Sequence, residues 1–401
     1  MQTLIKDRPR WHLLFMAFLS SVALLLTLNH LSSFDPSPLP SIAPGQNLSI
    51  LLSNAEFDCN ACEKPNVTEP KLAWEACLDR GSAPEYYMSI VIVTRSDDYA
   101  GDQRHRLQNM IDSTYILAMR TRTRMELLIV EWNPAIGRQR IKDIFRFRRS
   151  EYLVYRIISV PKKIHDTRPN IGNIPLHDYE GKNVGIRFAR GEFILCTNQD
   201  NIWSWNMHNA VASKSFVPNM FYSQYQDRHD NHADHLPKTL VRLPSFPNDE
   251  KVFNACPINA FGYGQFVMPT PEPITMDNFF KIGQHAGDFI LGHRDTWRIP
   301  RGFREAGGTA WIDMEFLMTA QWTFDIPITF TYNTLSCHQD HANVWENNPG
   351  AQNDNTKVDL SKMQAKEDKY VNERGEWGLY NVNIWEMGLE CAAFRGGSGV
   401  L

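Results

Sequence analysis

The stretch NVGIRFARGEFILCTNQDNIWS, residues 183–204, ends in a polar cluster whose side chains could do chemistry. Its strand-like run EFILCT leads directly into Asn198, Gln199 and Asp200. A carboxylate such as Asp200 is the protein ligand that Mg²⁺ and Mn²⁺ prefer, together with phosphate oxygens and water. Asn198 points to the same side of an extended chain, where its amide could hold a ribose hydroxyl or a metal-bound water. The same residues could also form an ordinary polar turn.

Two earlier strand-like runs also end in polar residues. SIVIVTR is an apolar, β-branched run typical of a buried parallel strand, and Arg95 and Asp97 follow it. MELLIVEWNP ends on Glu131 and Asn133. Ligands of open parallel α/β sheets bind outside the carboxyl ends of the strands, so these residues would lie along one edge with Asp200. The pattern predicts a polar ligand site there, although each residue alone could be a solvated turn residue or a helix cap.

Helical and strand-like patterns alternate along the first half of the chain. HRLQNMIDSTYILAMRTR, IKDIFRF and GKNVGIRFAR have helical spacing, whereas YLVYRIISVP and EFILCT are typical of strands. This alternation predicts an α/β domain with a mostly parallel sheet and helices on both faces. Further on we expect a strand at 289–291, a helix from about Ile312, and one strand, ITFTYNTLSCHQDH, that ends in a histidine-rich loop. The polar tail from about Asn347 is expected to wrap the surface.

The order SIVIVTR, ELLIVEWNP and KNVGIRFARGEFILCTNQDNIWS resembles nucleotide-sugar-dependent glycosyltransferases of the GT-A fold, in particular family-2-like members. In those enzymes a strand–helix half binds the nucleotide, and a D-x-D-like motif closes it. Here the motif would be Asn198-Gln199-Asp200, in which an amide replaces the first acid. The similarity covers roughly residues 86–345. It implies a GT-A (Rossmann-like) fold and a divalent metal, Mn²⁺ or Mg²⁺, at Asp200.

The later segment GDFILGHRDTWRIPRGFREAGGTAWIDMEFLMTA resembles the acceptor side of such enzymes. By that resemblance Asp288 would lie near the donor sugar, and Asp313 and Glu315 would face the acceptor. If the reaction inverts configuration, a carboxylate must take the proton of the acceptor hydroxyl. Asp313 is then the first candidate for the catalytic base and Asp288 the second. Asp288 could instead cap a turn, and Asp313 could favour a helix start.

The CHQDH loop resembles the late histidine of many GT-A enzymes, so His338 or His341 would complete the metal shell or touch the diphosphate. The resemblance also implies a set of residues in contact with the nucleotide sugar. They are Thr94, Arg95, Asp97, Glu131, Asn183, Arg187 and Asn198.

The N-terminal segment predicts a membrane anchor. MQTLIKDRPR, which is rich in basic residues, precedes the uncharged run WHLLFMAFLSSVALLLTLNHL. A helix of about 20 apolar residues spans a bilayer, and flanking basic residues favour the cytoplasmic side. A cleaved signal peptide is the alternative. By analogy we expect a single-pass type II protein of the Golgi or endoplasmic reticulum membrane. Its parts would be a cytoplasmic tail at 1–10, a transmembrane signal-anchor at 11–32, a lumenal stem at 33–85, a catalytic domain at 86–345 and a C-terminal extension at 346–401.

Sequons and cysteines agree with a lumenal location. N-glycosylation sequons begin at Asn47 and Asn66. The seven cysteines suit an oxidising compartment. Cys196 lies inside a strand-like run and is expected to be a buried free thiol, which leaves six cysteines for disulfides of open connectivity. A zinc site at Cys59 and Cys62 is disfavoured, because no second pair follows at finger spacing.

Composition limits the partners. The chain has 401 residues and a formal net charge of −4, and it lacks a long basic block, so nucleic acid is a poor candidate partner. The expected partners are a nucleotide-sugar donor, a glycan or glycoconjugate acceptor, and the membrane. Two alternatives stay open: a nucleotidyltransferase, and a catalytically inactive GT-A-like binding or scaffold protein.

Overall fold

The computed structural model describes most of the chain after residue 69. The described residues are 70–170, 173–224, 240–244, 247–256, 268–283, 286–305, 311–331, 335–341, 360–367 and 372–396. Among these residues no helix is both long and apolar enough to cross a membrane. The predicted signal-anchor at 11–32, the two sequons, and Cys59 and Cys62 lie outside the described residues.

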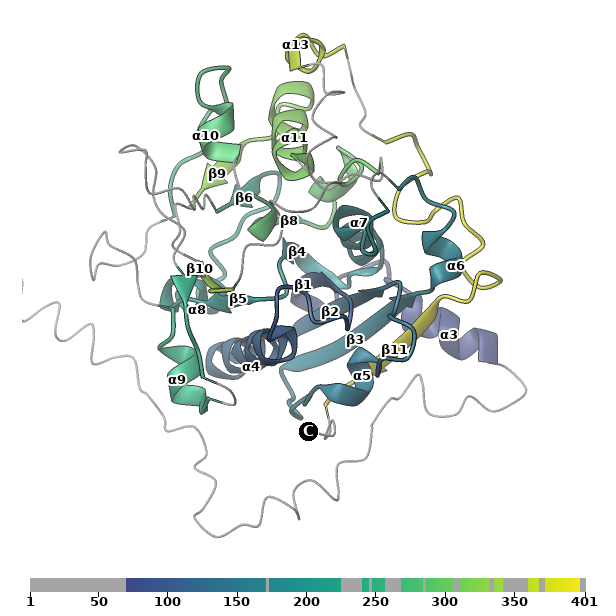
Figure 1. The fold of residues 1–401 in the computed structure, drawn as a ribbon. Helices are drawn as coiled ribbons and strands as arrows, with labels where there is room; N and C mark the ends of the chain where they lie inside the picture. The colour runs from purple at the N-terminus through teal and green to yellow at the C-terminus, as the bar shows by residue number, and fades with distance from the viewer. Residues whose placement is uncertain are drawn as a thin grey trace, which may run out of the picture. The chain divides into compact units, whose positions relative to one another are not determined.

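An eight-stranded sheet lies at the centre of the fold, with the strand order β11-β3-β2-β1-β4-β8-β6-β9 (Figure 1). Its strands are β1 (Tyr86–Thr94), β2 (Met125–Trp132), β3 (Leu153–Val160), β4 (Gly191–Thr197), β6 (Phe221–Ser223), β8 (Phe289–His293), β9 (Ile328–Phe330) and β11 (Glu390–Phe394). Strands β3, β2, β1 and β4 are parallel, whereas β8 and β11 run antiparallel to their neighbours β4 and β3. The expected parallel α/β sheet is confirmed for this four-strand half, whose carboxyl ends share one edge.

Helices cover both faces of the sheet, as the sequence predicted. They are α3 (Pro70–Leu78), α4 (Gln103–Thr121), α5 (Ile141–Ile144), α6 (Lys162–His165), α7 (Asp178–Phe188), α8 (Trp205–Ala212), α9 (Asp249–Phe253), α10 (Phe279–Gly283), α11 (Ile312–Met318) and α13 (Leu360–Gln364). Alternate side chains of β1 point to opposite faces of the sheet and pack in two separate hydrophobic cores. Val91 and Val93 pack in the core on the α7 and α11 side, and Ile90 and Ile92 pack in the core on the α4 and α8 side.

Two glycines let α7 approach β1 closely. A Cβ atom at Gly185 would lie 2.2 Å from a methyl carbon of Val91, and one at Gly181 would lie 2.6 Å from a methyl carbon of Val93. Real Cβ atoms do not approach that closely, so any larger residue would push the helix away from the strand. Lys182 lies between the two glycines, and the close packing of the helix on the sheet buries its side chain completely.

A second, smaller sheet has the order β5-β10-β7, formed by β5 (Asn201–Trp203), β10 (Ser336–Gln339) and β7 (Leu240–Val241). The expectation of a single strand across ITFTYNTLSCHQDH is wrong. Its first part is β9, which pairs with β6 in the large sheet, and its last part is β10, which pairs with β5. The run divides because each part has its own partner strand.

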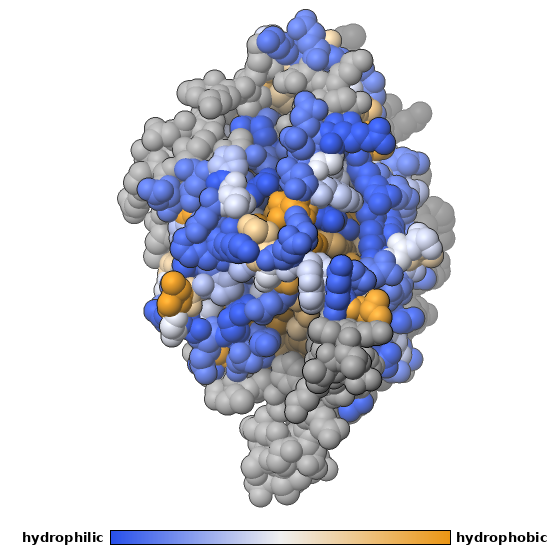
Figure 2. Space-filling view, turned by 90° about the vertical axis from the view of Figure 1, so that its right-hand side faces the viewer, coloured by the Kyte–Doolittle hydropathy of each residue, from blue (hydrophilic) through white to orange (hydrophobic). Residues whose placement is uncertain are grey.

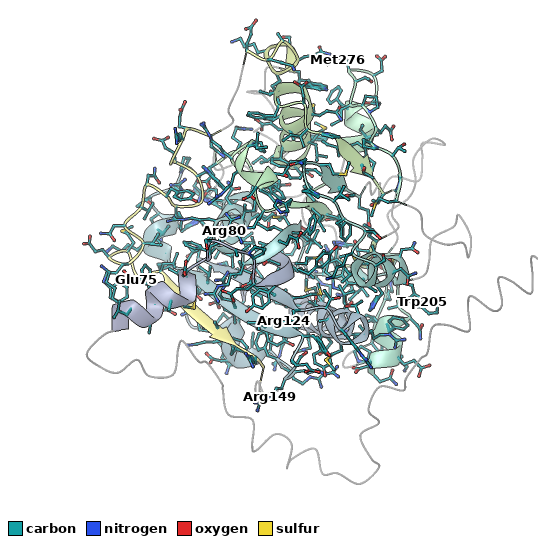
Figure 3. All side chains as sticks on the ribbon, turned by 180° about the vertical axis from the view of Figure 1, so that it is seen from behind. Glu75, Arg80, Arg124, Arg149, Trp205 and Met276 are labelled. Atoms are coloured by element: carbon teal, nitrogen blue, oxygen red, sulfur yellow. A yellow bond between two sulfur atoms is a disulfide. The ribbon has the colours of Figure 1, made fainter. Side chains whose placement is uncertain are left out.

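The C-terminal tail contributes to the large sheet. The expectation that it only wraps the surface is wrong for Glu390–Phe394, because this strand pairs antiparallel with β3 along the whole of its length. A disulfide joins Cys77 of α3 to Cys391 of β11, and the Trp74 indole N–H donates to the carbonyl of Leu389 at 2.7 Å. Helix α3, which carries Glu75, therefore lies beside β11 (Figure 3).

The other described cysteines form one more disulfide and one free thiol. Cys256 and Cys337 form a second disulfide, and Cys337 lies in β10. Cys196 is buried and free, so that prediction is confirmed. The space-filling view of Figure 2 shows a largely hydrophilic face on which apolar residues form small, separate patches. Scattered patches of this size are usual on a protein surface.

The disulfide between Cys77 and Cys391 yields a stability prediction. Replacing either cysteine with alanine should lower the free energy of unfolding by roughly 2–5 kcal/mol, because the cross-link closes a very long loop of the unfolded chain. Urea unfolding under non-reducing conditions measures the change. The double variant is the control, and should be about as stable as either single variant because all three lack the same bond. An unfolding midpoint equal to that of the unaltered protein would contradict the prediction.

Candidate functional site

The turn between β4 and β5 is tied to the start of β8. The Thr197 hydroxyl and the Asn201 side-chain amide both donate to the backbone carbonyl of Asp288, at 2.6 Å each. The Asn198 side-chain amide donates to the Asp288 carboxylate. These bonds hold the turn, and with it Asp200, against the residue that precedes β8. Predicted site residues from two distant parts of the sequence therefore lie together.

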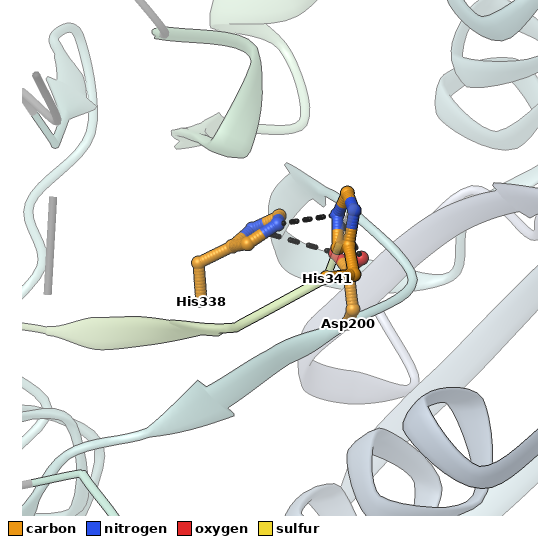
Figure 4. Close-up of side chains that lie close together, drawn as sticks. All are labelled: Asp200, His338 and His341. Atoms are coloured by element: carbon orange, nitrogen blue, oxygen red, sulfur yellow. Dashed lines mark hydrogen bonds and ion pairs between the residues drawn. The ribbon is translucent and has the colours of Figure 1, made fainter. Parts of the chain in front are cut away.

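Asp200, at the end of this turn, forms a compact group with His338 and His341 (Figure 4). One possible ligand atom from each lies within 4.8 Å of the other two. Asp200 Oδ1 is 3.5 Å from His338 Nδ1, and Asp200 Oδ2 is 3.2 Å from His341 Nε2. The two histidines approach through their Nε2 atoms, which are 2.9 Å apart. The pairing of His338 with Asn201 in the small sheet explains why His338 lies next to Asp200.

Asp200 is a buried anion. Burial works to raise its pKa, but His338, His341 and Arg106 outweigh burial, so the pKa of Asp200 lies well below its ordinary value. Arg106 Nη1 lies 2.5 Å from Asp200 Oδ2, and both side chains are buried. No described residue donates a hydrogen bond to Asp200 Oδ1. Sequence reasoning missed Arg106, which lies in the first turn of α4 rather than at a strand end.

The chemistry of this group fits a divalent metal. A carboxylate oxygen and imidazole nitrogens are both metal ligands in proteins, and here they converge at short range. Asp200 Oδ1 is a buried oxygen that accepts no hydrogen bond from any described residue. Burying such an oxygen costs free energy unless a partner, such as a cation, compensates for the lost water. Asp200, His338 and His341 could therefore hold a divalent cation together, and we refer to these three residues as the metal-binding group.

The three predicted catalytic acids have different surroundings. Asp288 Oδ2 lies 3.6 Å from His338 Nδ1, so this carboxylate adjoins the metal-binding group. Asp313 Oδ2 accepts the backbone N–H of Gly287 at 2.6 Å, and burial raises the pKa of the Asp313 carboxyl. Asp313 thus supports the peptide that precedes Asp288. Glu315, two residues further along α11, accepts from Arg304 Nε at 2.7 Å instead.

A fully buried lysine, which sequence reasoning missed, supports the same region. Lys182 Nζ contacts Asp178 Oδ2 at 2.6 Å, the carbonyl of Gly287 at 3.1 Å and Asn198 Oδ1 at 3.3 Å. Burial acts to lower the pKa of Lys182, but Asp178 overcomes this effect and the pKa is raised. Asp178 and Lys182 are spaced four apart on α7, the spacing of a helical ion pair, which is the one signal that could have pointed to Lys182.

The end of β1 lies beside the turn that contains Asp200. The Thr94 hydroxyl donates to the Gln199 side-chain carbonyl. Arg95 Nε donates to the carbonyl of Asn133 at 2.6 Å, and its Nη1 contacts Asp97 Oδ2 at 2.7 Å. Thr94 is therefore linked directly to the turn. Arg95 and Asp97 follow it at the same edge of the sheet.

Glu131 has a different setting from the other strand-end acids. Its Oε1 accepts the N–H of Ile141 at 2.9 Å, and its Oε2 accepts from Arg140 Nε at 2.8 Å and from the Ser159 hydroxyl at 2.7 Å. Both oxygens are thus engaged within the protein. These contacts join β2 to α5 and β3, and the structure does not bring Glu131 to the metal-binding group.

Two predicted nucleotide-sugar contacts on α7 bond to later segments of the chain. The Asn183 side chain donates to the carbonyl of Phe303 at 2.7 Å and to Glu305 Oε1 at 2.9 Å, and it accepts the Phe303 N–H at 2.8 Å. Arg187 Nη1 donates to the carbonyl of Gly378 at 2.9 Å. These side chains hold two later segments of the chain against α7.

A pocket of about 490 Å³ opens beside the metal-binding group. Residues 100–102, His105 and Arg106, the end of β7 and the loop that contains His341 form its walls. Its lining includes the basic residues His105, Arg106 and Arg242 and the acidic residues Asp102 and Asp340, and Asp340 pairs with Arg242. Because Arg106 and His341 both touch Asp200, the pocket and the metal-binding group are continuous.

Glu305 yields a pH prediction. Burial raises its pKa from 4.5 to about 7, against the opposing effect of Arg168. An acid whose pKa is raised in the folded state stabilises that state below its unfolded pKa, and this contribution is lost as pH rises through the folded pKa. The unaltered protein should therefore lose about 3 kcal/mol of unfolding free energy between about pH 4.5 and pH 7 through this group. Glu305→Gln should flatten that part of the profile. Urea unfolding at several pH values measures it, and parallel profiles for the two proteins would refute it.

No protein-family model matches the chain, and no curated protein matches it. Solved structures of low identity do match. The catalytic domain of Drosophila beta1,4-galactosyltransferase 7 with xylobiose has 11% identity and a TM-score of 0.32, over 70% of this chain and 80% of that chain. The mannosyltransferase PcManGT from Pyrobaculum calidifontis, with GDP-Man and Mn²⁺, has 12% identity and a TM-score of 0.34, over 69% of this chain and 65% of that chain. GalNAc-T7 with UDP, GalNAc and Mn²⁺ has 10% identity and a TM-score of 0.34, over 66% of this chain and 45% of that chain.

Proposed function

We propose that the protein transfers a sugar from a nucleoside diphosphate sugar to the hydroxyl group of an acceptor. The observation that carries this proposal is the group of Asp200, His338 and His341 at the carboxyl edge of the parallel strands, with a second carboxylate, Asp288, beside it. A metal site next to a carboxylate suits a reaction that needs both a stabilised anionic leaving group and a base.

The metal is proposed to be Mn²⁺ rather than Mg²⁺. Mg²⁺ favours all-oxygen, octahedral shells that retain several waters, whereas the group offers one carboxylate and two imidazoles. Such a cation would act as a Lewis acid for the charge that develops on the leaving diphosphate. Asp200 stays ionised in the buried site and is therefore ready to bind a cation without first losing a proton.

The pocket beside the metal-binding group is proposed to receive the nucleoside diphosphate. Its walls include His105, Arg106 and Arg242 besides the acids Asp102 and Asp340, and it abuts the N-terminal end of α4. Asp340 is paired with Arg242, so Arg106 is the cation that this proposal mainly depends on. A helix N-terminus and cationic side chains both favour an anionic ligand. A pocket of about 490 Å³ lies within the usual range for small-ligand sites.

Asp288 is our first choice for the catalytic base of an inverting reaction, ahead of Asp313. Asp288 adjoins His338, and Asn198 orients its carboxylate by donating a hydrogen bond. Asp313 accepts the Gly287 N–H and thus acts on the peptide before Asp288. Asp313 is accordingly proposed to be a positioning residue.

The amide at position 198 suits this arrangement. Asn198 accepts from Lys182 through its oxygen and donates to Asp288 through its nitrogen. An ionised aspartate can only accept hydrogen bonds, so at this position it would face the Asp288 carboxylate without a proton between them. The departure from a D-x-D motif is therefore compatible with an active site.

We further propose a single-pass type II arrangement in the Golgi or endoplasmic reticulum membrane, with a glycan, glycoprotein or glycolipid acceptor. The uncharged run at 11–32 and the sequons motivate this proposal. Two disulfides among the described residues suit an oxidising lumen.

Ligand-induced stabilisation tests the proposal. UDP or GDP with Mn²⁺ should raise the melting temperature of the unaltered protein, because a ligand that binds only the folded state stabilises it. Asp200→Ala should abolish the shift, whereas Asp166→Ala, a change at an exposed residue paired with Lys162, should retain it. No shift with any such ligand would contradict the proposal. Binding without sugar transfer would indicate the inactive binding protein, and pyrophosphate release from a nucleoside triphosphate and a sugar phosphate would indicate a nucleotidyltransferase.

Kinetics of two variants test the assignment of the base. Asp288→Asn should lower kcat by about 10²–10⁴-fold while donor affinity changes little, because the proton acceptor is lost and its shape is kept. Asp313→Asn should lower kcat by about tenfold or less, since it acts through the Gly287 peptide. The pH dependence of kcat should lose its acidic limb in Asp288→Asn alone. The opposite ranking of the two variants would return the role of base to Asp313.

A further inference from the structure

Arg106 places a fixed positive charge against the metal-binding group. Its Nη1 lies 2.5 Å from Asp200 Oδ2, and its Nη2 donates to the carbonyls of Tyr99 and Gly101. The side chain is buried, and it lies in the first turn of α4. Three contacts from one planar guanidinium hold it in a single orientation, as a lysine could not.

This arrangement opposes metal binding when the site holds no anion. Arg106 occupies Asp200 Oδ2, which leaves Oδ1 as the oxygen without a hydrogen bond from any described residue. A cation held by Asp200, His338 and His341 would share the Asp200 carboxylate with Arg106, in a buried setting where like charges repel strongly. The carboxylate would also have to divide its charge between two cations.

We propose that Arg106 is an internal counter-cation that keeps the affinity of the site for a divalent metal low until a diphosphate binds. This inference rests on the proposed metal site at Asp200. A diphosphate bound in the adjoining pocket would bring negative charge beside Arg106 and cancel the repulsion, so metal and nucleotide would each strengthen binding of the other. The protein would thus take up its metal together with the donor, and Arg106 would bind the donor directly.

The pocket provides the place for that anion. Arg106 lines it together with His105, Arg242 and His341, and His341 also touches Asp200. The acids Asp102 and Asp340 line it as well, and Asp340 is paired with Arg242. The Arg106 Nε–H is buried and makes no hydrogen bond with any described residue. A buried, charged donor in this state is costly, and a phosphate oxygen is the acceptor that arginine binds best.

Direct measurement of Mn²⁺ binding tests the role of Arg106. Electron paramagnetic resonance of free Mn²⁺, titrated against the full chain without nucleotide, gives the affinity independently of activity. Arg106→Gln should bind Mn²⁺ about tenfold or more tightly than the unaltered protein, because the like charge is gone while a donor to the carbonyl of Tyr99 is kept. Arg106→Lys keeps the charge and should retain weak binding. Arg104→Gln, an exposed change on the same helical turn, is the matched control and should leave the affinity unchanged.

A second measurement uses the unaltered protein, so its result does not depend on whether the variants fold. Saturating UDP or GDP should tighten its Mn²⁺ binding by about tenfold or more, and this coupling should shrink in Arg106→Gln. Equal Mn²⁺ affinity with and without either nucleotide would overturn the inference. So would Arg106→Gln binding Mn²⁺ no more tightly than the unaltered protein, which would leave Arg106 as a purely structural partner of Asp200. A protein that binds Mn²⁺ in none of these forms would instead overturn the proposed metal site itself.

Discussion

The burial of Asp200 as an anion is the constraint on which the site depends. A buried carboxylate is tolerated only where cations or hydrogen-bond donors surround it. Arg106 supplies a full charge, and His338 and His341 supply imidazole nitrogens at 3.5 and 3.2 Å. Each of these partners comes from a part of the chain far from the turn after β4. Stabilising one charge therefore requires α4, β10 and the loop after β10 to meet at one point.

The fold satisfies that requirement by tying the partners to the turn more than once. The pairing of β10 with β5 aligns His338 with Asn201, and the Gln339 N–H donates to the carbonyl of Asp200 at 3.0 Å. The disulfide between Cys256 and Cys337 anchors β10 immediately before His338. Such cross-links keep potential metal ligands in place even when no metal compensates the cost of bringing them together.

Patterns local in sequence were sufficient to predict the elements and part of the site. Apolar, β-branched runs and helical spacing located β1 to β4, α4 and α7, because burial of one strand or helix face leaves a periodic trace. Lys182 and Arg106 were missed, since nothing in their own neighbourhood shows which carboxylate they would meet. Glu131 and Asn183 lie where a ligand contact was expected, yet their side chains join elements of the protein. A polar residue at a strand end has the same sequence pattern in either role.

The amide in the D-x-D-like motif follows from the same electrostatics. Lys182 donates to Asn198, Asn198 donates to Asp288, and Asp288 Oδ2 lies 3.6 Å from His338 Nδ1. Only a side chain that both accepts and donates can occupy the middle of this series, and a carboxylate cannot do so without a proton. The amide also spares the site a third negative charge beside Asp200 and Asp288, whose mutual repulsion would grow in a buried setting. Asparagine at position 198 thus orients Asp288 while adding no further negative charge to the site.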